Sequence, residues 1–250
     1  MTDDKTESNF DCEGLRTPEH LCEPDPRTQS FVRVDNESGM IRPLSQADQY
    51  DSITKFTLLN AVPEKVRILF DTARNLYLYA WFVYRFYNVA EQQVFACLEM
   101  ALRERLNDEM PLPEEYWPKK RRGQPPSLRP MLRYVIDRGY IKNEGFRTWR
   151  DRGIIRAQQR YEMEKLQEMQ EKGLESMELD YSEVVVTDED LQDYDYLDAL
   201  LKYLPSARNN YAHGSGMLHN QVLHSFEVVS ELVNQLFPVS HRASPRPGSI

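Results

Sequence analysis

The sequence contains few residues of the kinds that build disulfide frameworks, metal centres or membrane spans. Its 250 residues include three Cys, five His and ten Gly, and apolar residues make up only 40% of it. The cysteines, at positions 12, 22 and 97, are odd in number and irregular in spacing, which favours a reducing cytoplasm over a disulfide scaffold. The most apolar run, residues 76–84, is far shorter than the roughly 20 residues that a membrane-spanning helix needs. The acidic start has no apolar segment, so no secretory signal is predicted. We therefore expect a cytoplasmic protein with no membrane partner.

Charge is distributed along the chain in blocks. The formal net charge is -9. Residues 111–160 nevertheless carry 13 basic and five acidic side chains, a net charge of +8, while residues 161–206 carry three and 14, a net charge of -11. A partner meets the local field rather than the total. The acidic total therefore does not exclude a nucleic-acid partner.

Two segments in the first half of the chain show helical spacing of apolar residues. A helix is predicted to start at Pro63 and to continue to Tyr87. Its expected buried stripe is Val66, Leu69, Ala73, Leu76, Ala80, Val83 and Tyr87. The capping-box pattern Asn88-Val-Ala-Glu91 predicts that a second helix starts there and runs to about residue 106. The second half of the first helix is apolar nearly all round, which predicts that it is fully buried or shared with a second subunit.

A polar insertion, residues 107–187, separates these helices from the last part of the chain. It is predicted to contain a short helix after Ser127 and a long polar helix over 154–172, ended by Gly173 and typical of a solvated arm. Residues 183–187 form the only plausible strand. Helical order returns at residue 187, Pro205 is expected to break or kink that helix, and a last helix is expected over 216–237.

These segments predict an all-α fold, a helical bundle with a polar helical insertion between its two halves. Residues 1–60 show no sustained periodicity and are predicted to be a mostly irregular N-terminal extension. The tail, residues 239–250, is predicted to be disordered.

Histidine is scarce, so each one can be considered as a candidate for chemistry. Cys12, His20 and Cys22 could begin a zinc site. Their spacing is not the C-x2–4-C of structural zinc sites, and no fourth ligand is near. An irregular polar segment is therefore favoured, and no metal or cofactor is expected. His219 and His224 lie about 140° apart on a helix, so they do not converge on one ion. The remaining candidate outside the tail is His213.

Arg208-Asn209-Asn-Tyr-Ala-His213 stands between the last two predicted helices. Together with the helical pattern of residues 63–106 and 190–238, it resembles the HEPN superfamily of all-α ribonucleases and RNA-binding domains, whose signature is R-x4–6-H. The resemblance predicts a HEPN-like helical domain over 61–238. It implies a site at a homodimer interface, with Arg208, Asn209 and His213 as catalytic residues. The Tyr that follows the motif in some family toxins is Ser215 here, so a tyrosine-modification switch is not predicted.

The chemistry of these residue types suits RNA cleavage. Attack of a 2′-OH on the neighbouring phosphorus needs proton transfer, which His213 can provide near neutral pH. Arg208 can hold phosphate oxygens, and Asn209 can position the phosphate. Each also has a purely structural interpretation: an ion pair for Arg208, a turn cap for Asn209 and a helix end for His213. Glu99 is predicted to support the site by orienting Arg208, with an Arg103 pair at i, i+4 as an equal alternative.

The basic block is a second candidate site. Its cations are interleaved with aromatic residues, a combination that binds RNA through phosphate contacts and base stacking. The predicted RNA-binding residues are Lys119, Lys120, Arg121, Arg122, Arg129, Arg133 and Arg150. An equal alternative is a solvated insertion whose basic half pairs with the acidic half downstream. The acidic block could also cover the basic one until RNA displaces it.

The leading hypothesis is therefore a cytoplasmic, homodimeric, metal-independent HEPN-type endoribonuclease, a class that serves in toxin and antiviral defence systems. The partners it implies are RNA, a second copy of the chain and an antitoxin or regulatory protein. One alternative is a non-catalytic HEPN-like module that binds RNA or protein. Another is a structural helical subunit whose acidic segment docks a basic partner.

Overall fold

The structure is a computed structural model that describes residues 11–35, 39–107, 111–117, 126–191, 194–212 and 219–238. Helices dominate these residues, and their one sheet is a two-stranded hairpin, so the predicted all-α class is confirmed. The described residues up to Arg105 and from Arg208 onward form a first compact unit, and Leu106–Ala207 form a second unit. No helix in the described part of the chain has the length and apolarity to cross a membrane.

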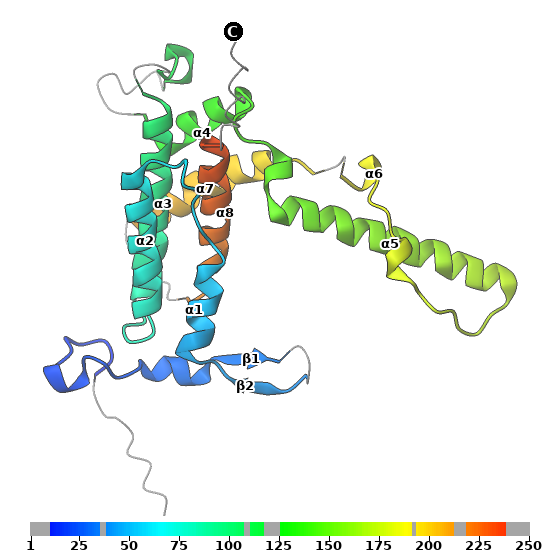
Figure 1. The fold of residues 1–250 in the computed structure, drawn as a ribbon, viewed down its shortest axis with the longest axis horizontal. Coiled ribbons are helices and arrows are strands. Elements are labelled where there is room, and N and C mark those ends of the chain that lie inside the picture. Colours follow the sequence, from blue (N-terminus) through cyan, green and yellow to red (C-terminus); the bar gives the residue numbers. More distant parts are fainter. Residues whose placement is uncertain are drawn as a thin grey trace, which may run out of the picture. The chain divides into compact units, whose positions relative to one another are not determined.

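Three helices build the core of the first unit: α2 (Glu64–Tyr79), α3 (Phe86–Arg105) and α8 (Leu223–Leu236). They lie side by side in Figure 1, and α3 packs against both of the others. The apolar residues at helical spacing on the second and last helices are buried where they are described, apart from Leu106, which is half-buried. On α3 and just before and within α8 these residues are Val94, Phe95, Leu98, Ala101, Leu102, Val222, Phe226, Val229, Val233 and Leu236.

The break between α2 and α3 comes earlier than the sequence predicted. α2 ends at Tyr79 and α3 begins at Phe86, so the expected helix start at Asn88 is wrong. Tertiary contacts hold the turn between them. The N–H of Asp25 donates to the carbonyl of Trp81 at 2.9 Å, and the fully buried Asp25 carboxylate accepts from the N–H of Tyr84 at 3.3 Å. A segment nearly 60 residues upstream therefore determines where the helix ends.

The predicted stripe of the first helix is confirmed at Val66, Ala73, Ala80 and Tyr87 and is wrong at Leu69 and Leu76. Phe70 and Tyr77 are buried, whereas Leu69 and Leu76 are only half-buried. Phe70 packs edge-on against Phe226, and Tyr77 against Tyr87, with ring centroids 5.8 and 5.5 Å apart. Large aromatic side chains bury more area than leucine, so they face the core. These rings are buried against one another within the first unit, so they are not exposed to a second copy of the chain.

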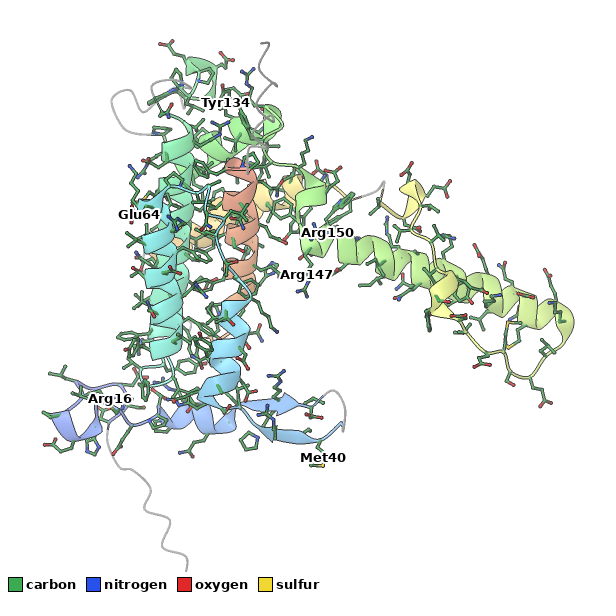
Figure 2. The ribbon with its side chains drawn as sticks, in the orientation of Figure 1. Arg16, Met40, Glu64, Tyr134, Arg147 and Arg150 are labelled. Carbon is green, nitrogen blue, oxygen red and sulfur yellow. The ribbon has the colours of Figure 1, made fainter. Side chains whose placement is uncertain are left out.

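The predicted irregular extension, residues 1–60, contains regular structure among its described residues. Helix α1 (Gln46–Thr54) starts with a capping box between Ser45 and Asp48. Strands β1 (Val32–Val34) and β2 (Ile41–Pro43) pair antiparallel, and short 3-10 turns span Pro18–His20 and Pro26–Ser30. Figure 2 shows Met40 near the tip of this hairpin. The pattern is hard to see because each piece is short and is fixed by contacts rather than by a sustained period.

Asp48 connects the hairpin to α1. Its carboxylate accepts from Arg33 of β1 at 2.8 Å and from Arg42 of β2 at 2.6 Å, as well as from Ser45. Hydrogen bonds from Arg42 and then Ser45 lower the pKa of Asp48 well below its usual range. Gln49 beside it bridges to the core, because its side-chain amide donates to the carbonyl of Tyr77 and accepts from the hydroxyl of Tyr87.

The second unit consists of helices and short turns. Its α-helices are α4 (Leu128–Asp137), α5 (Arg147–Lys172), α6 (Asp188–Leu191) and most of α7 (Tyr196–Ala212), and its 3-10 turns span Glu114–Tyr116, Asn143–Gly145 and Tyr181–Glu183. α5 ends where predicted, at a left-handed Gly173 with φ 65°. It begins at Arg147 rather than 154, and the predicted strand at 183–187 is wrong, since those residues leave a 3-10 turn and then extend without pairing.

One face of α5 is covered, so it is not the fully solvated arm that its polarity suggested. Gly153, Ala157 and Tyr161 are buried, and α6 packs against this face. The side chain of Leu191 lies so close to Gly153 that a Cβ there would clash with it. Arg160 donates to the Asp190 carboxylate at 3.0 Å and fixes α6 in place. Small residues on α5 thus let a short helix approach closely.

Candidate functional site

Arg208 and Asn209 lie within the last turns of α7 rather than at a break between helices. Pro205 was expected to break or kink this helix, and a break is wrong, because α7 continues through Pro205 to Ala212. A proline inside a helix removes one hydrogen bond and costs about 3 kcal/mol. Leu201 and Leu204 before Pro205 and Ala207 after it are all buried, and their burial offsets that cost. Arg208 and Asn209 therefore stand on a continuous helix.

Glu99 of α3 meets Arg208, as predicted. The Nε atom of Arg208 lies 2.5 Å from Oε1 of Glu99, a pair that joins residues 109 positions apart. Glu99 is only 8% exposed, while the Arg208 side chain is 40% exposed. The predicted alternative also occurs, since Nη2 of Arg103 donates to the other carboxylate oxygen at 3.2 Å. Glu99 thus holds two arginines at once.

The contact with Glu99 leaves Nη1 and Nη2 of Arg208 without a hydrogen-bond acceptor among the described residues. The pair with Glu99 uses Nε. A guanidinium that is anchored at one nitrogen and open at the other two can offer two parallel donors to phosphate oxygens. Asn209 follows it on the exposed side of the helix. Arg208 is therefore positioned as an anion-binding group.

Several predicted site residues lie outside the described residues. His213 is one, and so are the four cations of the basic loop, Lys119, Lys120, Arg121 and Arg122. Their predicted roles stay predictions.

Arg129, Arg133 and Arg150 belong to the second unit. All three are exposed, and Figure 2 shows Arg150 near the start of α5. Arg133 pairs with Asp137 at 3.2 Å, and Arg150 donates to the carbonyl of Glu144 at 2.7 Å. Arg129 makes no ion pair with any described residue. None of the three forms an ion pair with a described residue of the acidic block, residues 161–206.

A second buried carboxylate on α3 was missed by the sequence reasoning, which assigned Glu91 to a helix cap. Glu91 is 2% exposed. Its Oε1 accepts from the hydroxyl of Ser225 on α8 at 2.5 Å, and its Oε2 lies 3.3 Å from Nε2 of His219. The available signal was an acidic residue within the apolar face of a helix, next to Ala90 and before Val94. Buried charges of this kind are paired because an unpaired one is costly.

Glu99 and Glu91 contact the first residue of the predicted motif, Arg208, and a residue beyond its end, His219. They are eight residues apart on α3, about 12 Å along its axis at 1.5 Å per residue. Glu99 binds Arg208 at the start of the motif, and Glu91 lies beside His219 after its end. The two carboxylates therefore fix where Arg208 and His219 contact α3.

Comparisons with protein-family models, curated proteins and solved structures give no match for this chain. The described residues also contain no group of three or more His, Cys, Asp or Glu side chains arranged to hold a metal ion.

Proposed function

We propose that this protein is a HEPN-type endoribonuclease that cleaves RNA without a metal ion. The observation that supports the proposal best is the Glu99–Arg208 pair, in which no described residue accepts a hydrogen bond from the outer nitrogens of the motif arginine. In the proposed reaction the 2′-OH of RNA attacks the adjacent phosphorus and the 5′-oxygen leaves. Arg208 stabilises the negative charge of the phosphorane, and His213 transfers a proton.

The site is proposed to form between two copies of the chain in the cytoplasm, each supplying one Arg208 and one His213. This part of the proposal comes from the family resemblance. A toxin or defence role and an antitoxin or regulatory partner belong to the same expectation.

The decisive experiment is incubation of the purified protein with a mixed RNA pool in EDTA, followed by analysis of the new ends. We expect cleavage that leaves 2′,3′-cyclic phosphates, because the 2′-OH is the nucleophile. Arg208→Ala and His213→Ala should each abolish it. Arg85→Ala and His224→Ala are matched controls, since both side chains are exposed in pairs with Glu13 and Glu227. Undiminished cleavage in the Arg208 and His213 variants would overturn the proposal.

The alternative is a non-catalytic HEPN-like module that binds RNA or protein. It is favoured by the same ion pair in a different role, because a Glu99–Arg208 contact also pins the end of α7 to α3. Wild-type protein that binds RNA and never cleaves it would support this alternative. It would also leave Arg208→Ala with a lowered melting temperature and no other defect.

A further inference from the structure

A cavity of about 400 Å³ in the second unit is lined by a combination of side chains that the proposed site does not use. Its size lies within the range of small-ligand sites. Two aromatic residues, Tyr116 and Trp117, form part of the wall, together with cations from α4 and α7. The remaining lining residues are Ser127, Arg129, Pro130, Arg133, Asp198, Leu201 and Lys202.

The aromatic wall is held in place by its own contacts. The Trp117 indole N–H donates to the carbonyl of Leu112 at 3.1 Å. Tyr116 packs edge-on against Tyr134 with ring centroids 5.0 Å apart, and its hydroxyl donates to Asp137 at 2.9 Å. Tyr134, labelled in Figure 2, is itself buried. Rings fixed in this way can stack on a planar ligand with little loss of side-chain entropy.

The charge of the cavity favours an anion. Three cations line it, against one carboxylate. Lys202 is paired with that carboxylate, Asp198, at 2.6 Å, and Arg133 with Asp137 outside the lining. Arg129 is left without an ion-pair partner among the described residues. Ser127 at the start of α4 makes no capping hydrogen bond with its side chain, so the hydroxyl remains available.

We propose that this cavity binds one unpaired nucleotide, with its base stacked on Trp117 and Tyr116 and its phosphate held by Arg129 and Arg133. Aromatic faces beside arginines are what single-stranded nucleic acid recognises. The run Lys119-Lys120-Arg121-Arg122 follows Trp117 almost directly in the sequence, which favours a strand of RNA over a free nucleotide as the source. The choice of RNA rests on the proposed function, but binding can be measured where no cleavage occurs.

The test is binding of the full-length protein to a fluorescein-labelled adenylate hexamer whose 2′-hydroxyls are methylated, so that it cannot be cleaved by 2′-OH attack. Arg129→Ala should weaken binding on the order of tenfold. It should also reduce the slope of log K against log salt by about 0.7, the contribution of one phosphate contact on a single strand. Lys172→Ala removes an equal charge far along α5 and should leave both values unchanged. Equal effects of the two variants would overturn the proposal.

A second measurement tests the aromatic wall separately. Stacking of adenine on Trp117 should quench tryptophan emission when the unlabelled hexamer is added. Trp117→Phe should remove that quenching and leave the salt slope unchanged, because Phe still stacks and carries no charge. Quenching that persists in Trp117→Phe would overturn the assignment. Adenosine monophosphate that binds as tightly as the hexamer would overturn RNA as the source of the nucleotide.

The cleavage assay separates this proposal from the proposed function. If the wild type binds the hexamer through Arg129 and never cuts RNA, the nuclease proposal fails and the nucleotide site stands. If the wild type cuts RNA and Arg129→Ala leaves KM unchanged, the nucleotide site fails and the nuclease proposal stands.

Discussion

At the scale of single residues, the first unit is organised by two carboxylates buried on one helix. Glu99 faces Arg208 and Arg103, and Glu91 faces Ser225 and His219. An ionised carboxylate in an apolar environment is tolerated only when cations or hydrogen-bond donors satisfy it. Each carboxylate therefore selects partners from segments more than 100 residues away.

Glu99→Gln should impair the positioning of Arg208 more than it impairs the stability of the fold. Arg208 would keep a hydrogen-bond acceptor and lose its charged anchor. We expect kcat for RNA cleavage to fall roughly tenfold through misorientation, while the free energy of unfolding falls by only about 1 kcal/mol because Arg208 is part-exposed. Single-turnover cleavage and urea unfolding measure the two effects. Glu104→Gln is the control, since Glu104 lies on the same helix and pairs outward with Lys65. Equal kinetic losses in both variants would contradict the positioning role.

Ser225→Ala should destabilise the first unit by about 1–3 kcal/mol, because a buried carboxylate oxygen of Glu91 loses its donor. Ser230→Ala is a closely matched control. Both serines are 5% exposed on α8, but the Ser230 hydroxyl donates only to the carbonyl of Glu227 in its own helix. Chemical unfolding of the two variants would show the difference. The same loss in both would mean that the Glu91 contact contributes nothing of its own.

At the scale of elements, most helices and several of their ends were predictable, since α2 begins after Pro63, α4 begins after Ser127 and α8 ends before Phe237. The predicted start of the last helix at 216 is wrong, because α8 begins at Leu223. The end of α5 was predictable because Gly173 adopts a left-handed conformation that few other residues tolerate. The start of α3 and the continuity of α7 depend instead on contacts of Asp25 and on burial around Pro205, which local patterns do not contain.

Gly173→Ala should lower the free energy of unfolding by about 1 kcal/mol, because a Cβ is strained at φ 65°. This corresponds to a drop of about 2–4 °C in Tm for a protein of this size. No described residue lies within 4 Å of the added Cβ, so the expected cause is backbone strain rather than a clash. Gly173→Asn should recover part of the loss, since Asn tolerates this conformation better. A Tm for Gly173→Ala equal to that of the wild type would contradict the assignment.

At the scale of the whole molecule, the alternating charge blocks are only partly paired. Arg160 of the basic block pairs with Asp190 of the acidic block, whereas Lys165 pairs with Glu183 within the acidic block. Arg133 at the cavity pairs with Asp137, and Arg147 at the start of α5 pairs with Asp151, both within the basic block. Masking of the basic block by the acidic one therefore stays a hypothesis. If deleting residues 175–195 leaves RNA affinity and its salt slope unchanged, that hypothesis is wrong.

Acid should destabilise both units. Hydrogen bonds from Arg42 and Ser45 lower the pKa of Asp48, and those from Arg160 and Thr187 lower the pKa of Asp190. A carboxyl whose folded pKa is lowered stabilises the fold above its ordinary pKa of 3.8, and this stability is lost as pH falls below that value toward the folded pKa. We expect Tm to decline between pH 5 and pH 3.

The double variant Asp48→Asn with Asp190→Asn tests the cause. It should start from a lower Tm at pH 7 and show a shallower decline with acid, because two of the responsible groups no longer titrate. Thermal unfolding by circular dichroism across this pH range is sufficient. A wild-type Tm that is constant from pH 5 to pH 3, or equal slopes for wild type and variant, would contradict the explanation.

The sequence by itself determined the all-α class, the buried stripes of α3 and α8, the end of α5 and the pairing of Glu99 with Arg208 or Arg103. These follow from periodicity, from a conformation that favours glycine, and from charges placed where a partner is required. Only the tertiary structure decided that Phe70 and Tyr77 face the core, that α1 packs on α2 and α8 and binds the hairpin through Asp48, that α7 continues past Pro205, and that Glu91 meets Ser225 and His219. The physical reason is the same in each case: contacts between residues far apart in the chain outweigh local preferences of a few kcal/mol.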